Sequence, residues 1–179
     1  MEQPQPNDGP GNGETHDFNL RPKSRTGPLH RDSARFHVFL VDTGWNAPVS
    51  KVLHEHVHLF HRYHPQDPLY ILTREQSIAL LKHAPDHIGL DPMVIMYDMY
   101  RPAHMTKKLA NYHGFRLNLG VFKNPQQAAS KLQEFLKFVA KNREAECLSD
   151  EVARELHREG MSNVVKLLRE ASEASLEIL

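Results

Sequence analysis

The sequence of 179 residues contains one cysteine, Cys147, and one tryptophan, Trp45. A single cysteine excludes an internal disulfide and any Cys-x-x-Cys redox or zinc pair, and it is typical of a reducing compartment. Net charge is also absent, because 22 Lys and Arg residues balance 22 Asp and Glu residues. A neutral chain has no overall positive field to attract nucleic acid or an anionic membrane, so we expect neither as a partner.

Long apolar runs are missing as well. No stretch of the sequence approaches the roughly 20 apolar residues that a membrane span requires. Residues 1–10 lack the basic start and apolar core of a secretory signal. We therefore expect a soluble, cytoplasmic protein.

The chain divides into three parts by composition. Residues 1–34 are rich in Pro, Gly, Asn and Asp and hold too few large apolar groups to offset the entropy of ordering them, so we expect a disordered arm. Residues 35–143 are expected to form one α/β domain, since a core of buried-type residues begins at Phe36. Residues 144–179 are expected to form a C-terminal helical extension.

Segments typical of strands and helices alternate from Phe36 onward. Short apolar runs predict strands over 36–41, 69–72 and 93–97, and an alternating pattern over 115–119 predicts a half-buried edge strand. Helical patterns cover 48–63, 74–83 with Thr73 as N-cap, 125–142, 149–159 and 162–172.

The apolar stripes of the last two helices indicate packing on the domain or a homodimer. A helix-turn-helix interpretation of this region fails, because its second helix carries too few cations for phosphate contacts.

Residues 41–49 read Val-Asp-Thr-Gly-Trp-Asn-Ala-Pro-Val and follow the first strand. This segment resembles the Trp-Cys-Gly-Pro-Cys segment of thioredoxins, with Asn46 and Val49 in place of the two cysteines. Asp91-Pro92 precedes the third strand, similar to the position at which thioredoxins keep a cis-proline. Leu119-Gly120 and the helix after it are similar to the end of the last thioredoxin strand and its C-terminal helix. Over residues 36–142 the resemblance implies a thioredoxin-like three-layer sandwich without redox cysteines.

One departure from thioredoxins leaves a second topology open. Thioredoxins join their third and fourth strands by a tight hairpin, whereas about 17 residues, Asp98 to Gly114, intervene here. If residues 105–112 formed a helix, a right-handed crossover to a parallel strand would give a Rossmann-like or flavodoxin-like sheet instead.

The resemblance implies a function without catalysis. Thioredoxin-like proteins with degenerate active-site loops act as adaptors, assembly factors and chaperone-like modules, so we expect a protein-binding module without a cofactor. In the resembling fold, the surface that grips an extended peptide of a partner corresponds to Trp45, Asn46, Ala47, Pro48 and Pro92.

Histidine is unusually abundant, with 13 copies. On a continuous helix, His54, His58 and His61 share one face, and imidazoles at positions i and i+4 can bind one metal ion. A solvated face is the simpler interpretation, because no second layer of groups is evident to hold the rings. His56 points to the apolar side and is expected to be a hydrogen-bonded core histidine.

Asp42 and Asp98 follow or end predicted strands, where open α/β sheets place their sites. They support an alternative hypothesis, a small α/β enzyme or metal-handling protein that uses Asp42, Asp98 or the face of His54, His58 and His61. No Gly-rich phosphate loop and no Gly-x-Ser-x-Gly elbow accompany them, so a structural role for both carboxylates is favoured.

Redox inactivity is directly testable. Cys147 has acidic neighbours, Glu144 and Glu146, which disfavour a thiolate, and no second thiol exists to resolve a mixed disulfide. We predict no dithiol-dependent reduction of insulin in a turbidity assay. Turnover that Cys147→Ser abolishes would contradict this prediction.

Overall fold

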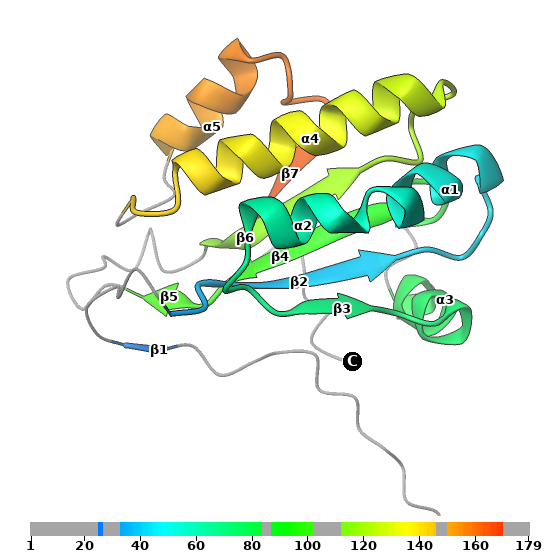
Figure 1. Cartoon of the computed structure of the whole chain (residues 1–179), viewed down its shortest axis with the longest axis horizontal. Helices are drawn as coiled ribbons and strands as arrows, with labels where there is room; N and C mark the ends of the chain where they lie inside the picture. The colour runs from blue at the N-terminus through cyan, green and yellow to red at the C-terminus, as the bar shows by residue number, and fades with distance from the viewer. Residues whose placement is uncertain (1–24, 27–32, 84–86, 102–111, 146–149, 170–179) are drawn as a thin grey trace, which may run out of the picture.

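A computed structural model describes residues 25–26, 33–83, 87–101, 112–145 and 150–169. The described chain forms a mixed α/β fold in which one open five-stranded sheet lies between helices (Figure 1). One face of the sheet is covered by α1 (Ala47–Glu55), α2 (Val57–Tyr63) and α4 (Pro125–Lys141). The other face is covered by α3 (Arg74–His83). A fifth helix, α5 (Asp150–Arg158), is joined to α4 by an ion pair of 3.0 Å between Lys141 and Glu155.

The sheet is mixed, with the strand order β3-β2-β4-β6-β7. β3 runs parallel to β2, whereas β4, β6 and β7 each pair antiparallel to the preceding strand in that order. The parallel Rossmann-like or flavodoxin-like alternative is therefore wrong, because it requires β6 to run parallel to β4. The strands are β2 (Phe36–Val41), β3 (Leu69–Ile71), β4 (Met93–Asp98), β6 (Tyr112–Asn118) and β7 (Val165–Arg169).

The C-terminal region corrects two predictions. The helix predicted over 162–172 is not present in the described part of that range, 162–169, because Val165–Arg169 is a strand. β7 pairs with β6, so β6 is an inner strand and not the predicted edge. The physical reason is that Val164 and Val165 are β-branched, and the backbone of β6 offers them a ladder of hydrogen bonds that a local helical pattern does not reveal. The apolar residues that suggested a helical homodimer are largely buried within the chain (Leu156, Val164, Val165 and Leu168).

The predicted helix over 48–63 is interrupted at His56. His56 adopts φ −102° and ψ 13° between α1 and α2. Its backbone N–H and its ring Nδ1 both lie within hydrogen-bond distance of the Val52 carbonyl, at 3.1 and 2.9 Å. His56 is half-buried, so it has the expected hydrogen bond but not the expected place in the core.

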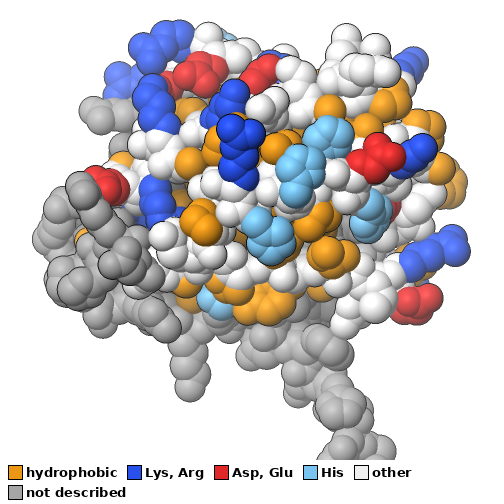
Figure 2. Space-filling model, in the orientation of Figure 1, with side chains coloured by type: hydrophobic (Ala, Val, Ile, Leu, Met, Phe, Trp, Pro, Cys, Tyr) orange, Lys and Arg blue, Asp and Glu red, His pale blue; other side chains and the backbone are white. Residues whose placement is uncertain are grey.

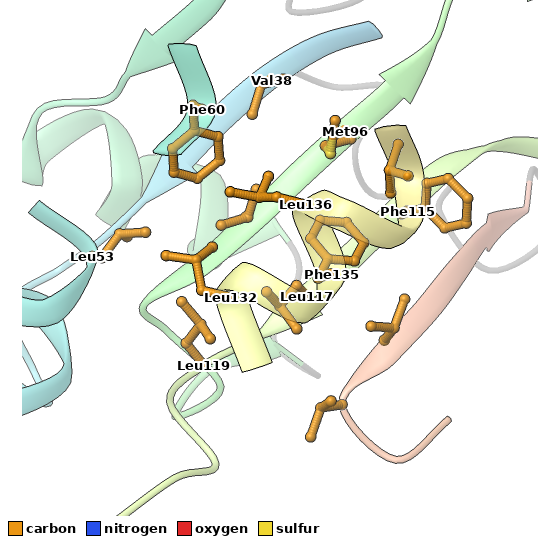
Figure 3. Packing of buried hydrophobic residues seen from close by; sticks show 14 of the residues in the cluster. Val38, Leu53, Phe60, Met96, Phe115, Leu117, Leu119, Leu132, Phe135 and Leu136 are labelled. Atoms are coloured by element: carbon orange, nitrogen blue, oxygen red, sulfur yellow. The ribbon is translucent and has the colours of Figure 1, made fainter. Parts of the chain in front are cut away.

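The main core lies between the sheet and α4. The apolar residues of α4 point at the strands beneath, as Figure 3 shows for Leu132, Phe135 and Leu136. Phe135 meets Phe115 of β6 edge to face, at a centroid distance of 6.0 Å. The stripe predicted for this helix is confirmed, because each of its members is fully buried (Ala128, Leu132, Phe135, Leu136 and Val139).

Parts of the predicted disordered arm, residues 1–34, are described by the structure. Within the stretch predicted to be a disordered arm, β1 (Arg25–Thr26) pairs with β5 (Tyr100–Arg101), and the Ser33 carbonyl accepts a hydrogen bond from Arg143 at 2.9 Å. The possible helix over 105–112 lies outside the described residues except for Tyr112, which begins β6. Cys147 lies outside them too.

Buried charged side chains link the start of the domain, at Arg35, to the segment that follows α4. The Arg35 guanidinium donates to both carboxylate oxygens of Asp98, at 3.1 and 2.8 Å, and to the carbonyls of Arg143 and Ala145. Asp67 accepts hydrogen bonds from the backbone N–H groups of Arg35 and Phe36, at 2.9 Å each. A buried ion pair of this kind costs several kcal/mol when one partner is removed, because the other charge is left without compensation.

The surroundings of Asp67 favour its charged form. Burial alone would raise its pKa, but hydrogen bonds from His64, Arg143 and the Phe36 N–H outweigh burial and lower the pKa from 3.8 to about 2. The folded state therefore binds this proton less readily than the unfolded state does. Asp67 contributes stability above pH 4, and that contribution is lost as the pH falls toward 2.

We predict that Asp67→Asn flattens the acid dependence of stability. Between pH 5 and pH 2 the wild-type protein should lose about 2 kcal/mol more unfolding free energy than the variant. Denaturant titrations across this range measure the difference, with Glu159→Gln as a control that removes an exposed carboxylate. Equal slopes for the wild type and Asp67→Asn would contradict the prediction.

Candidate functional site

The loop that follows β2 is held by its own Asp42 and by side chains from α1 and α3. Asp42 Oδ1 accepts hydrogen bonds from the Gly44 N–H and the Ser50 hydroxyl of α1, both at 2.8 Å. The Asp42 N–H donates to the Ser77 hydroxyl of α3 at 3.0 Å. Gly44 has φ 75°, a conformation that glycine adopts without the steric cost that a side chain brings. Asp42 thus fixes a tight turn that positions the next residues.

Thr43 ties the same loop to the segment before β4. Its N–H donates to Asp91 Oδ2 at 3.1 Å, and its hydroxyl donates to the same oxygen. Its carbonyl accepts a hydrogen bond of 3.0 Å from Nε of Arg74 on α3. The peptide bond between Asp91 and Pro92 is cis, as the position of this proline suggested.

Asn46 connects the loop to the turn after β6. Its Nδ2 lies 3.3 Å from the carbonyl oxygens of both Gly120 and Phe122. Gly120 packs closely on the segment before β4: a Cβ added at Gly120 would meet the carbonyl carbon of Leu90 at 2.6 Å and the Asp91 oxygen at a shorter distance. Three loops therefore meet at one end of the sheet.

Trp45 stands at the tip of this tethered loop and is 83% exposed. Beside it lies an open pocket of about 500 Å³ between the loop, α3 and the segment 88–91. Most of its exposed lining is apolar and comes from Trp45, Ile78, Leu81 and Ile88, with Arg74 and Lys82 among the polar lining residues. A pocket of this volume is in the range that accommodates a few side chains of a peptide or a small molecule.

The five residues expected to bind a peptide differ in their exposure. Trp45, Ala47 and Pro48 are exposed, Asn46 is half-buried, and Pro92 is buried. Asn46 and Pro92 therefore expose less surface to a ligand than the other three, and of the five only Trp45 lines the pocket.

Sequence reasoning missed the wall that α3 supplies. Arg74, Ile78 and Lys82 are spaced four residues apart, so they share one face of the helix. Ile78 and Ile88 are 37% and 66% exposed, which is unusual for isoleucine. The spacing was visible in the sequence, but the face of α3 that meets the sheet follows only from the fold.

The pocket offers little for nucleophilic chemistry. The Thr43 hydroxyl, which lines it, donates to the Asp91 carboxylate, and Asp91 is 2% exposed. The described residues that line this pocket include no thiol and no histidine. Its groups are suited to contact and orientation of a bound group.

The two candidate carboxylates lie at opposite ends of the sheet. Asp98 pairs in register with Phe36 at the start of β2, whereas Asp42 follows the end of β2. The separation is about 20 Å, six residues at roughly 3.3 Å each. The Asp98 carboxylate accepts hydrogen bonds from Arg35 and, at 3.0 Å, from the Tyr100 N–H. The two carboxylates therefore do not form one site.

The candidate histidines lie on the outer surface of α1 and α2. Figure 2 shows several histidine side chains gathered on that face of the molecule. His54 Nε2 lies 3.1 Å from Asp42 Oδ2, and His58 Nδ1 lies 3.2 Å from the Glu55 carbonyl. His54, His58 and His61 are exposed, and within the described ranges no three His, Cys, Asp or Glu side chains are grouped to hold a metal ion.

The close packing of Gly120 generates a prediction. Gly120→Ala should destabilise the protein by about 1–3 kcal/mol, because the new methyl group meets backbone atoms of Leu90 and Asp91 that cannot rotate away. Thermal or denaturant unfolding measures the change. Val121→Ala, at the exposed neighbouring position, is the control and should change stability little. Equal stability of Gly120→Ala and wild type would show that the three loops are not in close contact.

No family model, no curated protein and no solved structure matches the chain. Among the described helices, none is both long and apolar enough to cross a membrane.

Proposed function

We propose that this protein is a non-catalytic, thioredoxin-like binding module that takes up an extended segment of a partner protein at Trp45 and the pocket beside it. The observation that carries the proposal is the exposure of Trp45, 83%, on a loop that receives hydrogen bonds from Ser50 and Arg74 and donates one to Ser77. The proposed role is that of an adaptor, assembly factor or chaperone-like protein in the cytoplasm.

The order and direction of four strands support the thioredoxin-like assignment. β3, β2, β4 and β6 lie in this order, with β3 parallel to β2 and the other two antiparallel, and α4 follows β6. This is the arrangement that the resemblance implies. Pro92 precedes β4 beneath the Trp45 loop, at the position where the resembling fold keeps its proline. β7 and α5 are additions to that arrangement.

Energetics favour a binding role for Trp45. An exposed indole forgoes the stabilisation that burial would bring, about 25 cal/mol for each Å² of apolar surface. Tryptophan is enriched among the residues that dominate binding energy in protein interfaces. A loop fixed before binding loses little conformational entropy when a partner docks, so more of the contact energy is realised as affinity.

The absence of redox chemistry follows from the same residues. Asn46 and Val49 occupy the positions that correspond to the two cysteines of thioredoxins, and Val49 is fully buried. Asn46 instead donates to the turn after β6. The enzyme or metal-handling alternative receives less support, because Asp42 and Asp98 are separated and each accepts several hydrogen bonds.

We predict that peptides selected on this protein bind at Trp45. Random peptides displayed on phage are selected on the immobilised wild-type protein, and the enriched sequences are synthesised. They should change the fluorescence of Trp45, which is the single tryptophan of the chain and therefore reports only on this site. Trp45→Ala should weaken binding by about ten-fold or more in fluorescence anisotropy with labelled peptide.

The control is Ile71→Ala. Ile71 is 51% exposed on β3 and does not line the pocket, so its loss removes exposed apolar surface elsewhere. Both variants should unfold at the wild-type temperature, since each replaces an exposed side chain. Enriched peptides that bind Trp45→Ala as well as they bind wild type would contradict the proposal.

A further inference from the structure

The charge of the pocket narrows the kind of segment that fits it. Arg74 and Lys82 lie at either end of the stripe that α3 contributes, and the apolar Ile78 lies between them. Among the lining residues that the structure describes, Asp91 is the one carboxylate, and it is buried beneath Thr43, to which it is hydrogen-bonded. The exposed charge of this described lining is therefore positive, although the chain as a whole is neutral.

Both cations are available to a ligand. Arg74 is exposed and is positioned by the hydrogen bond from its Nε to the Thr43 carbonyl. Lys82 is exposed, and no ion pair to it is present among the described residues. Glu75, in the first turn of α3, is not among the lining residues.

The spacing of the two cations matches an extended peptide. Eight residues of helix separate Arg74 from Lys82, which is about 12 Å at roughly 1.5 Å per residue. In an extended chain, residues i, i+2 and i+4 face the same side, and the first and last are about 13 Å apart. A side chain at i+2 would then lie against Ile78, while those at i and i+4 would reach the two cations.

We infer that the occupant of this pocket is an extended peptide segment with the pattern acidic-x-apolar-x-acidic. The inference rests on the proposed function and specifies its ligand. The apolar side chain enters between Trp45, Ile78 and Ile88, and the two carboxylates pair with Arg74 and Lys82. Because both pairs are exposed, they discriminate between segments more than they add affinity.

Synthetic peptides test the pattern directly. Each has a central leucine in a blocked Gly and Ser chain, with glutamate, glutamine or lysine two positions to either side. In titrations followed by Trp45 fluorescence, affinity should decrease from the glutamate peptide to the glutamine peptide to the lysine peptide. The first and last should differ by about ten-fold in dissociation constant. The preference should shrink as salt is added, because exposed charges are screened.

A charge reversal provides the second readout. Lys82→Glu should weaken binding of the glutamate peptide by about five-fold and strengthen binding of the lysine peptide by a similar factor. Lys82 is the better position to vary, because Arg74 also holds the loop. Lys137→Glu is the matched control, since it makes the same charge change at an exposed position of α4, on the other face of the sheet.

The outcomes separate the inference from the proposed function. Equal binding of the three peptides, lost in Trp45→Ala, would overturn the charge pattern and leave the binding site in place. A charge preference that Lys82→Glu does not alter would overturn the assignment of Lys82. If none of the peptides, and none selected from the random library, changes Trp45 fluorescence, the proposed function itself is wrong.

Discussion

The antiparallel pairing of β4 with β2 is the constraint on which the rest of the site depends. Because β4 enters the sheet where β2 leaves it, Asp91 lies beneath the loop that carries Trp45 and accepts its hydrogen bonds from Thr43. The same pairing carries Asp98 to the opposite end, where it meets Arg35. One end of the sheet is thereby built from hydrogen-bonded loops, and the other is closed by buried charges. The proposed binding end and the charged end are separated by the length of the core.

Within the loop after β2, some side chains fix the backbone and Trp45 is left exposed for the proposed binding. The side chains of Asp42 and Asn46 form hydrogen bonds with neighbouring backbone and hydroxyl groups. These bonds fix the loop and leave the two side chains few polar atoms for a ligand. Trp45 makes no such contribution and faces outward. A rigid loop with one large, exposed aromatic side chain is suited to recognition by contact, and α3 adds the charges that such a side chain cannot supply.

Much of this fold could be predicted from the sequence, because strong local patterns agree with the final packing. The apolar runs of β2 and β4 and the stripe of α4 are long and regular, and Thr73 caps α3 by accepting from the Gln76 N–H at 3.2 Å. β7 could not be predicted, because its five residues fit a helix locally and become a strand only through pairing with β6. The Trp45 loop was located by resemblance, whereas the wall from α3 required knowledge of which helix face meets the sheet.

β7 has a consequence for the chain as it is being synthesised. It is the last of the five strands in sequence, and residues 119–164 separate it from β6. Until it emerges from the ribosome, β6 is an open edge whose unpaired N–H and C=O groups flank Phe115 and Leu117. Unpaired apolar edges of this kind are templates for aggregation. Nascent chains that stall before β7 are therefore expected to expose this edge, even though all five described helices precede β7 in the sequence.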